Sequence, residues 1–142
     1  MSEKSKQQTV LVVDADPIVR RYVTQVLGEE GFTVLQASDQ TDAVEVATNS
    51  ARPIDLMIAE LHLPSCRATE LARTLAASFP CMQTLVMSSL YRRIVRCQDT
   101  PKARWLTKPF SPEALQRRVK RLLAQAVCAV PQAGIYPQCL PT

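Results

Sequence analysis

The sequence lacks any apolar stretch that approaches the length of a membrane span. A helix needs about 20 consecutive apolar residues to cross a bilayer. The apolar run that follows the polar N-terminus ends at Asp14, which is too short for the hydrophobic region of a signal peptide. We therefore expect a cytoplasmic protein that does not span a membrane.

Glycine and histidine are also scarce. Three glycines in 142 residues exclude a collagen-like or low-complexity chain. The five cysteines form no Cys-x-x-Cys pair and His62 is the only histidine, so the spacing of a zinc site is missing. We expect the cysteines to be reduced thiols that pack as small hydrophobic side chains.

The length and composition indicate one globular domain, because 46% of the residues are hydrophobic and 21% are charged. We expect a disordered N-terminal segment at 1–8, the folded domain at 9–128 and a proline-containing tail at 129–142. Charge is divided unevenly along the chain. Residues 1–91 hold 7 Lys/Arg and 11 Asp/Glu (net −4), whereas residues 92–142 hold 10 and 2 (net +8).

Apolar runs alternate with helical periodicity along most of the chain. The runs that predict strands are 9–13, 33–37, 55–59, 84–87 and 104–107. Helical patterns start at Pro17, after Ser38 or Asp39, and at Ser111; another has its apolar stripe at 71–79, and the weakest lies at 92–103. This alternation predicts an α/β fold, a doubly wound five-stranded parallel sheet with helices on both faces.

In such a sheet, ligands bind beyond the carboxyl ends of the strands. Polar side chains follow four of the predicted strands: Asp14 and Asp16, Glu60, Ser88 and Ser89, and Lys108. We predict that they form one site. Asp16 is followed by Pro17, so we expect it to cap the first helix rather than bind a ligand.

Four segments resemble the receiver domains of bacterial response regulators. They are Val-Val-Asp-Ala-Asp-Pro at 12–17, Asp-Leu-Met-Ile-Ala-Glu-Leu-His-Leu-Pro at 55–64, Met-Ser-Ser at 87–89 and Leu-Thr-Lys-Pro-Phe at 106–110. The resemblance covers residues 9 to about 126. It implies a flavodoxin-like sheet of order 2-1-3-4-5 and a role in two-component signal transduction, in which a histidine kinase phosphorylates an aspartate ending the third strand.

By this resemblance, Lys108 is the ammonium that pairs with the acceptor carboxylate, and Ser88 is the hydroxyl that bonds the phosphoryl oxygen. The bond between Lys108 and Pro109 matches a bond that is cis in the family. Two positions depart from the pattern: the acceptor is Glu60 instead of aspartate, and Ala15 replaces the second member of an acidic pair. Phosphoryl transfer needs both a positioned nucleophile and a magnesium ion.

These departures predict a protein that is not an enzyme and has no catalytic residue. With only Asp14 and Glu60 as ligands, we expect Mg²⁺ binding to be weak or absent. The extra methylene displaces the Glu60 carboxylate by about 1.5 Å, and a misplacement of that order costs about 100-fold in a positioned reaction. We therefore expect no phosphorylation at Glu60.

We hypothesise that Glu60 reaches Ser88 and Lys108 and imitates a phosphorylated aspartate. The protein is then an atypical single-domain response regulator, a pseudo-receiver that binds partners without phosphorylation. The alternative is an ordinary, partly buried Glu60–Lys108 ion pair without switching. Trp105 occupies the position of a family aromatic whose rotamer reports the state of the site, and it is also consistent with a core or surface aromatic.

The basic half of the chain predicts an interaction face. We place Arg117, Arg118 and Arg121 on the side of the last helix that faces away from its apolar stripe, where a plainly solvated face is the alternative. Expected partners are a separate protein, such as a histidine kinase or effector, or a second copy bound through the fourth helix, fifth strand and fifth helix. A phosphorylatable receiver and a nucleic-acid-binding regulator remain alternatives, although no DNA-binding motif supports the latter.

Overall fold

The computed structural model describes residues 7–89 and 104–125. The elements, in chain order, are β1 (Thr9–Val13), α1 (Pro17–Glu29), β2 (Thr33–Ala37), α2 (Gln40–Thr48), β3 (Leu56–Glu60), α3 (Ala68–Ala76), β4 (Gln83–Ser88), β5 (Trp105–Thr107) and α5 (Pro112–Gln125). The helix predicted at 92–103 and the tail at 129–142 lie outside the described residues. No helix within the described ranges is long and apolar enough to cross a membrane.

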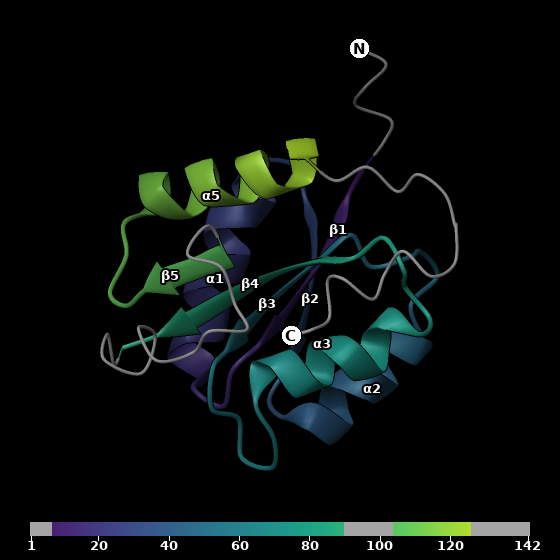
Figure 1. Cartoon of the computed structure of the whole chain (residues 1–142). Helices are drawn as coiled ribbons and strands as arrows, with labels where there is room; N and C mark the ends of the chain where they lie inside the picture. The colour runs from purple at the N-terminus through teal and green to yellow at the C-terminus, as the bar shows by residue number, and fades with distance from the viewer. Residues whose placement is uncertain (1–6, 90–103, 126–142) are drawn as a thin grey trace.

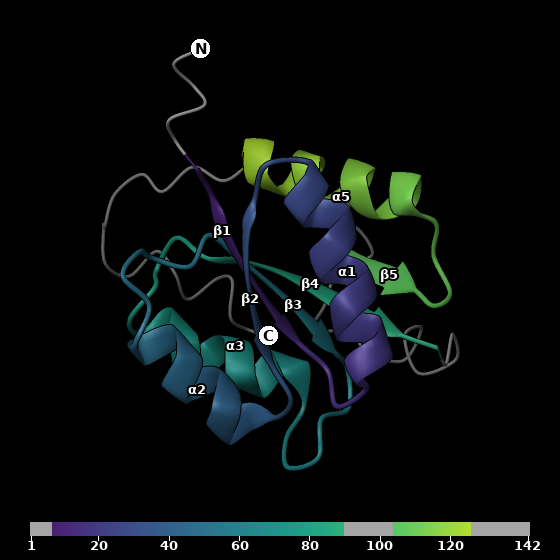
Figure 2. The same ribbon diagram turned by 180° about the vertical axis from the view of Figure 1, so that it is seen from behind.

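The five strands form one parallel sheet of order β2-β1-β3-β4-β5. Helices α1 and α5 lie on one side of the sheet and α2 and α3 on the other (Figures 1 and 2). The predicted fold class and strand order are therefore confirmed.

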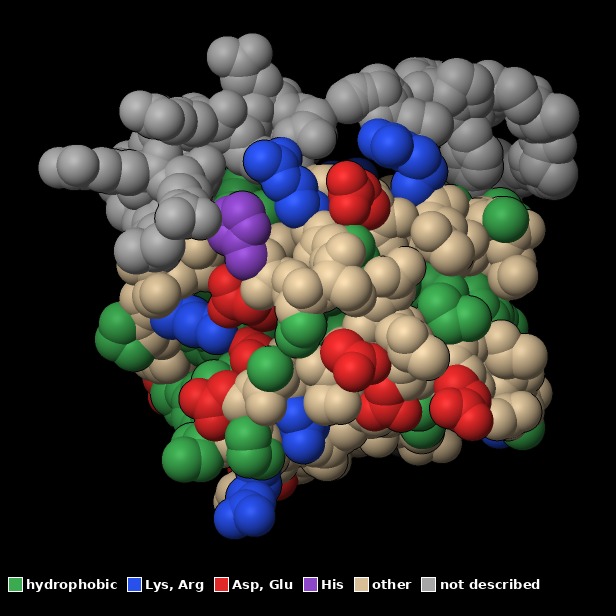
Figure 3. All heavy atoms as spheres, turned by 90° about the horizontal axis from the view of Figure 1, so that it is seen from below, with side chains coloured by type: hydrophobic (Ala, Val, Ile, Leu, Met, Phe, Trp, Pro, Cys, Tyr) green, Lys and Arg blue, Asp and Glu red, His purple; other side chains and the backbone are tan. Residues whose placement is uncertain are grey.

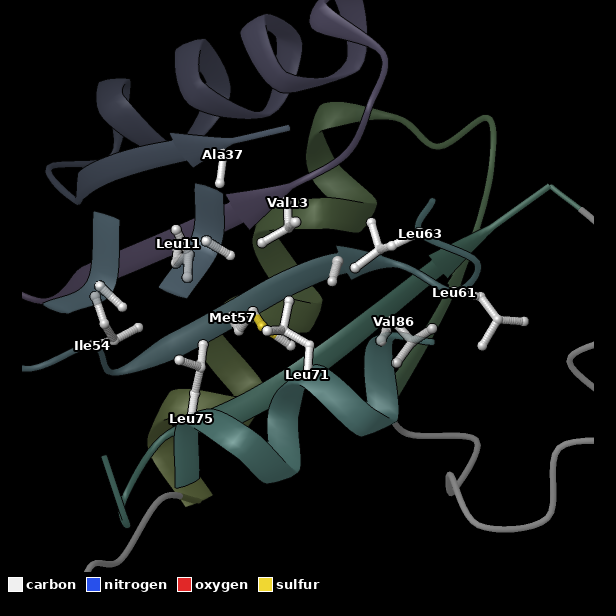
Figure 4. Close-up of a cluster of buried hydrophobic side chains, with 14 of the residues drawn as sticks. Leu11, Val13, Ala37, Ile54, Met57, Leu61, Leu63, Leu71, Leu75 and Val86 are labelled. Atoms are coloured by element: carbon white, nitrogen blue, oxygen red, sulfur yellow. The ribbon is translucent and has the colours of Figure 1, made fainter. Parts of the chain in front are cut away.

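The sheet is buried on both faces because its central strands are predominantly apolar. All five residues of β1 are buried. Successive side chains of a strand point to opposite faces, so Leu11 and Val13 join the cluster under α2 and α3, whereas Val10 and Val12 join the cluster under α1 and α5. Figure 4 shows the first of these clusters, in which strand side chains face those of α3.

Two helices begin at the predicted caps. The side chain of Asp16 accepts a hydrogen bond from the backbone N–H of Ile18 at 2.9 Å, and Pro17 is the first residue of α1. Asp39 accepts from the N–H of Asp42 at 2.8 Å at the start of α2. Each aspartate satisfies a donor that the first turn of its helix leaves unpaired.

Some predicted boundaries were wrong by a few residues. Strand β3 begins at Leu56 and reaches Glu60, one residue later than predicted, because Glu60 still pairs with Met87 of β4. Helix α3 ends at Ala76, although its apolar stripe continues to Phe79. The N–H groups of Ser78 and Phe79 both bond to the carbonyl of Leu75, so a turn replaces the last part of the helix.

The expectation for the cysteines was wrong at one position. Cys81 is exposed and disulfide-bonded, so it does not pack as a reduced core thiol. Cys66 is a free thiol that packs, partly buried, against the cluster on the α2 and α3 side. Burial, followed by the charge of Glu70, raises the pKa of the Cys66 thiol.

Candidate functional site

The carboxyl ends of the strands bring the predicted site residues to one edge of the sheet. Backbone hydrogen bonds continue the pairing just beyond the strands: Asp14 N–H donates to the carbonyl of Ala37 at 3.1 Å, and Lys108 N–H donates to the carbonyl of Ser88 at 3.0 Å. These bonds fix the backbone at the point where the polar side chains emerge. Figure 3 shows the molecule from below the view of Figure 1, with acidic side chains spread over the visible face.

The ammonium group of Lys108 lies between two carboxylates. Lys108 Nζ is 2.8 Å from Oδ2 of Asp14 and 2.5 Å from Oε1 of Glu60. The side chain of Asp14 is 5% exposed, whereas those of Lys108 and Glu60 are 19% and 20% exposed. One cation therefore joins the ends of β1, β3 and β5, and this junction is called the Lys108 bridge below.

The protonation of Lys108 is reinforced by its partners. Burial by itself lowers the pKa of the ammonium group, but the hydrogen bonds and charges of Asp14 and Glu60 outweigh this and raise the pKa above its ordinary value. Lys108 therefore keeps its charge throughout the neutral range. The predicted contact between Glu60 and Lys108 is present.

Asp14 makes further contacts that sequence reasoning missed. Its Oδ1 accepts a hydrogen bond from the N–H of Asp16 at 2.9 Å, and its backbone carbonyl accepts from Nη1 of Arg20 at 2.6 Å. Both carboxylate oxygens of Asp14 are therefore already bonded. The contact of Arg20 could have been anticipated from its position one turn into the helix that starts at Pro17.

Magnesium prefers an octahedral set of oxygen ligands, usually one or two carboxylates with several waters. Here Asp14 and Glu60 both bond the same ammonium, Ala15 has no ligand atom, and Asp16 is engaged as the cap of α1. Within the described ranges, no group of three or more His, Cys, Asp or Glu could hold a metal ion. The side chains at this edge do not fit a Mg²⁺ site in this arrangement.

Two aromatic residues fix the loop that follows Lys108. The hydroxyl of Tyr22 donates to the carbonyl of Phe110 at 2.8 Å, and the two rings lie 5.8 Å apart. Burial, followed by the charge of Glu113, raises the pKa of Tyr22. Helix α1 thus holds the β5–α5 loop, which includes the cis Lys108–Pro109 bond. The helical pattern that starts at Pro17 predicted the helix but did not identify this contact of Tyr22.

Ser88 and Trp105 are both buried, at 1% and 5% exposure. Ser88 ends β4 between the strands that carry Glu60 and Lys108. Trp105 packs in the hydrophobic cluster on the α2 and α3 side of the sheet, which agrees with the core interpretation of this residue. His62 is exposed in the loop after β3, where its backbone forms an isolated antiparallel β-bridge with Arg67.

The basic residues of α5 do not all face solvent as predicted. Arg117 and Arg121 are exposed, but the guanidinium of Arg118 turns back and donates a hydrogen bond to the carbonyl of Trp105. Arg118 thus bonds the edge strand β5, while Arg117 and Arg121 on the same helix stay exposed. Lys120 forms an ion pair with Glu30 at 2.8 Å.

The family of response regulator receiver domains matches residues 10–120 of the chain. The protein belongs to this family. Receiver domains are modules of two-component signal transduction. The Lys108 bridge lies at the edge of the sheet where the resemblance places the phosphorylation site.

Curated relatives are similar over most of this receiver chain. The transcriptional regulatory protein AruR of Pseudomonas aeruginosa is 30% identical over 136 residues, which cover 92% of this chain and 55% of AruR. The sensor histidine kinase RcsC of Salmonella typhi is 28% identical over 119 residues, which cover 82% of this chain and 12% of RcsC. The chain thus spans only part of the length of these relatives.

Solved structures show the same receiver fold. The chemotaxis response regulator CheY4 of Vibrio cholerae matches with a TM-score of 0.70 and 22% identity, covering 82% of this chain and 98% of that one. A response regulator receiver protein from Sinorhizobium medicae matches with a TM-score of 0.73 and 23% identity, covering 86% of this chain and 98% of that one. At these identities the likeness concerns the fold alone.

Proposed function

We propose that this receiver acts as a phosphorylation-independent protein-interaction module, an atypical response regulator in which Glu60 replaces the phosphoacceptor aspartate. The observation that carries the proposal is the Lys108 bridge. The acceptor carboxylate sits on a glutamate side chain, one methylene longer than an aspartate, and its Oε1 is bonded to the ammonium at 2.5 Å, so the reacting group is displaced from the position an aspartate would occupy. The proposed protein is not an enzyme.

The charge balance at the site supports this proposal. In phosphoryl transfer, a metal ion neutralises the charge that develops on the phosphoryl oxygens. Here the ammonium of Lys108 already neutralises part of the charge of Asp14 and Glu60, and Ala15 supplies no further acid. We infer that Mg²⁺ binds weakly or not at all and that Glu60 holds the domain in one signalling state.

A fixed state requires a partner that recognises it. Sensor histidine kinases and transcriptional regulatory proteins are among the relatives, and we infer that this chain binds a protein of the same signalling class, a kinase or an effector. A homodimer through β5 and α5 is a further arrangement that the same surface allows. The Glu60→Gln variant tests whether the signalling state held by Glu60 is needed for partner binding. Unchanged partner affinity would show that Glu60 and Lys108 form an ordinary ion pair without switching.

The direct experiment is incubation of the protein with acetyl phosphate and Mg²⁺, followed by intact mass measurement. The expected result is an unmodified mass, because the extra methylene of Glu60 moves the carboxylate away from the position of an aspartate. A single phosphoryl adduct on the wild-type chain would overturn the proposal and establish a phosphorylatable receiver.

A restored variant provides the matched control for this experiment. Ala15→Asp combined with Glu60→Asp returns the family's acid pair and acceptor, while Ser88 and Lys108 stay unchanged. We expect this double variant to take up one phosphoryl group under conditions that leave the wild type unmodified. If the variant is modified at position 60 and the wild type is not, the two substitutions account for the loss.

A further inference from the structure

Helix α5 carries four basic residues at 117–121 that differ in what they contact. Lys120 is paired with Glu30 of the α1–β2 turn, and Arg118 is bonded to the carbonyl of Trp105. Arg117 and Arg121 are exposed and have no hydrogen bond or ion pair in the described part of the chain. Glu113 is one turn before Arg117, but the two do not approach within ion-pair distance there.

Arg117 and Arg121 lie on the same face of α5. Side chains four residues apart on a helix are neighbours, and like charges at this spacing repel each other. The repulsion is felt by the next residue, because burial and then the charges of Arg121 and Arg117 lower the pKa of Arg118. Among the described residues, the two guanidinium groups are therefore an uncompensated pair on an exposed helix, which is unfavourable for the isolated protein.

We propose that Arg117 and Arg121 form a docking site for an acidic segment of a partner protein. Two guanidinium groups one turn apart present parallel donors that match carboxylates, each of which accepts a bidentate hydrogen bond. The proposal gives the chemical character of the partner in the interaction role proposed above, and it rests on that proposed function. The basic pair contrasts with the acidic side chains at the end of the molecule seen in Figure 3.

The small number of uncompensated basic groups on α5 favours a compact acidic segment over an extended polyanion. A nucleic acid tracks along a protein through many phosphate contacts, whereas the described part of α5 offers two uncompensated guanidinium groups, because Lys120 is paired with Glu30 and Arg118 is bonded to the carbonyl of Trp105. A short acidic segment needs only these two groups. In a symmetric dimer, identical residues meet only near the two-fold axis, so a pairing with its axis at Arg117 and Arg121 would bring the two arginine pairs together and is disfavoured, whereas a dimer with its axis elsewhere on β5 and α5 is not.

The test uses a fluorescein-labelled, glutamate-rich helical peptide and measures its binding by fluorescence anisotropy. The test variant is Arg117→Gln with Arg121→Gln, and the control is Arg52→Gln with Arg73→Gln, which removes the same charge from exposed positions elsewhere. Glutamine keeps a good helix propensity. We expect the test variant to bind about tenfold more weakly than the wild type and the control to change by less than about twofold.

Several results would overturn the proposal. Equal weakening in both variants would show that only net charge matters. Tighter binding of a labelled DNA duplex than of the peptide, lost in the test variant, would assign the arginine pair to nucleic acid. Self-association in sedimentation that the test variant abolishes would assign it to a second copy. None of these measurements uses a phosphodonor, so they succeed or fail separately from the phosphorylation experiment.

Discussion

The two carboxylates that share the ammonium of Lys108 differ in their access to water. Asp14 is 5% exposed, whereas Glu60 is 20% exposed and can turn toward solvent. Removing the ammonium would therefore leave a buried charge at Asp14 without its cation, and an unpaired buried charge is strongly destabilising.

Replacing Lys108 by methionine should lower the free energy of unfolding by about 3 kcal/mol at neutral pH, as measured by urea denaturation. The folded-state pKa of Lys108 is raised, so its contribution is complete below its unfolded value of about 10.4 and is lost as the pH rises through the folded value. The difference between the wild type and Lys108→Met should therefore shrink in alkaline solution. Tyr22, whose pKa is also raised, titrates in both proteins.

The matched control is Lys120→Met, which breaks the ion pair with Glu30. Lys120 is 60% exposed, and a solvent-exposed pair contributes at most about 1 kcal/mol. A loss as large for Lys120→Met as for Lys108→Met would contradict the assignment of a special role to the Lys108 bridge.

Some single-residue contacts could be predicted and others could not. The topology of a parallel sheet brings the ends of its strands to one edge, which predicted that Glu60 and Lys108 would meet. The contacts of Arg20, Tyr22 and Arg118 were not predicted, because periodicity shows which face of a helix is buried and not where a long polar side chain ends.

At the scale of elements, strands were predicted more accurately than helix ends. β1 and β2 have the predicted bounds because their runs are apolar and bounded by polar residues. The end of α3 was misjudged because Phe79 continues the apolar pattern although the backbone has already turned. Hydrophobic spacing records burial, and a turn can bury a side chain as well as a helix does.

The first helix provides a test of whether Asp16 is a cap or a ligand. Replacing Asp16 by alanine should lower the free energy of unfolding by about 1 kcal/mol in urea denaturation, because the N–H of Ile18 loses its acceptor. Asp16→Asn, which keeps the acceptor, should lose only a small part of this. A loss of similar size is expected for Asp39→Ala at the start of α2. No loss for Asp16→Ala would contradict the cap assignment.

At the scale of the whole molecule, the proposed state is independent of divalent cations. Trp105 is the sole tryptophan and lies buried on β5, two residues from the end of that strand. Its emission should stay unchanged when Mg²⁺ is added to millimolar concentration, because Asp14 and Glu60 remain bonded to Lys108. The Ala15→Asp, Glu60→Asp variant should respond in the same titration. A saturable response of the wild type would contradict the metal-independent assignment.

The bond between Arg118 and the carbonyl of Trp105 has a consequence for the behaviour of concentrated solutions. β5 is the last strand of the sheet, and a terminal strand with open backbone groups invites the strand of another molecule, which leads to aggregation. The guanidinium occupies one of the acceptors that such a strand would need. Through this bond, α5 makes the edge strand β5 less available for pairing with a strand of another molecule.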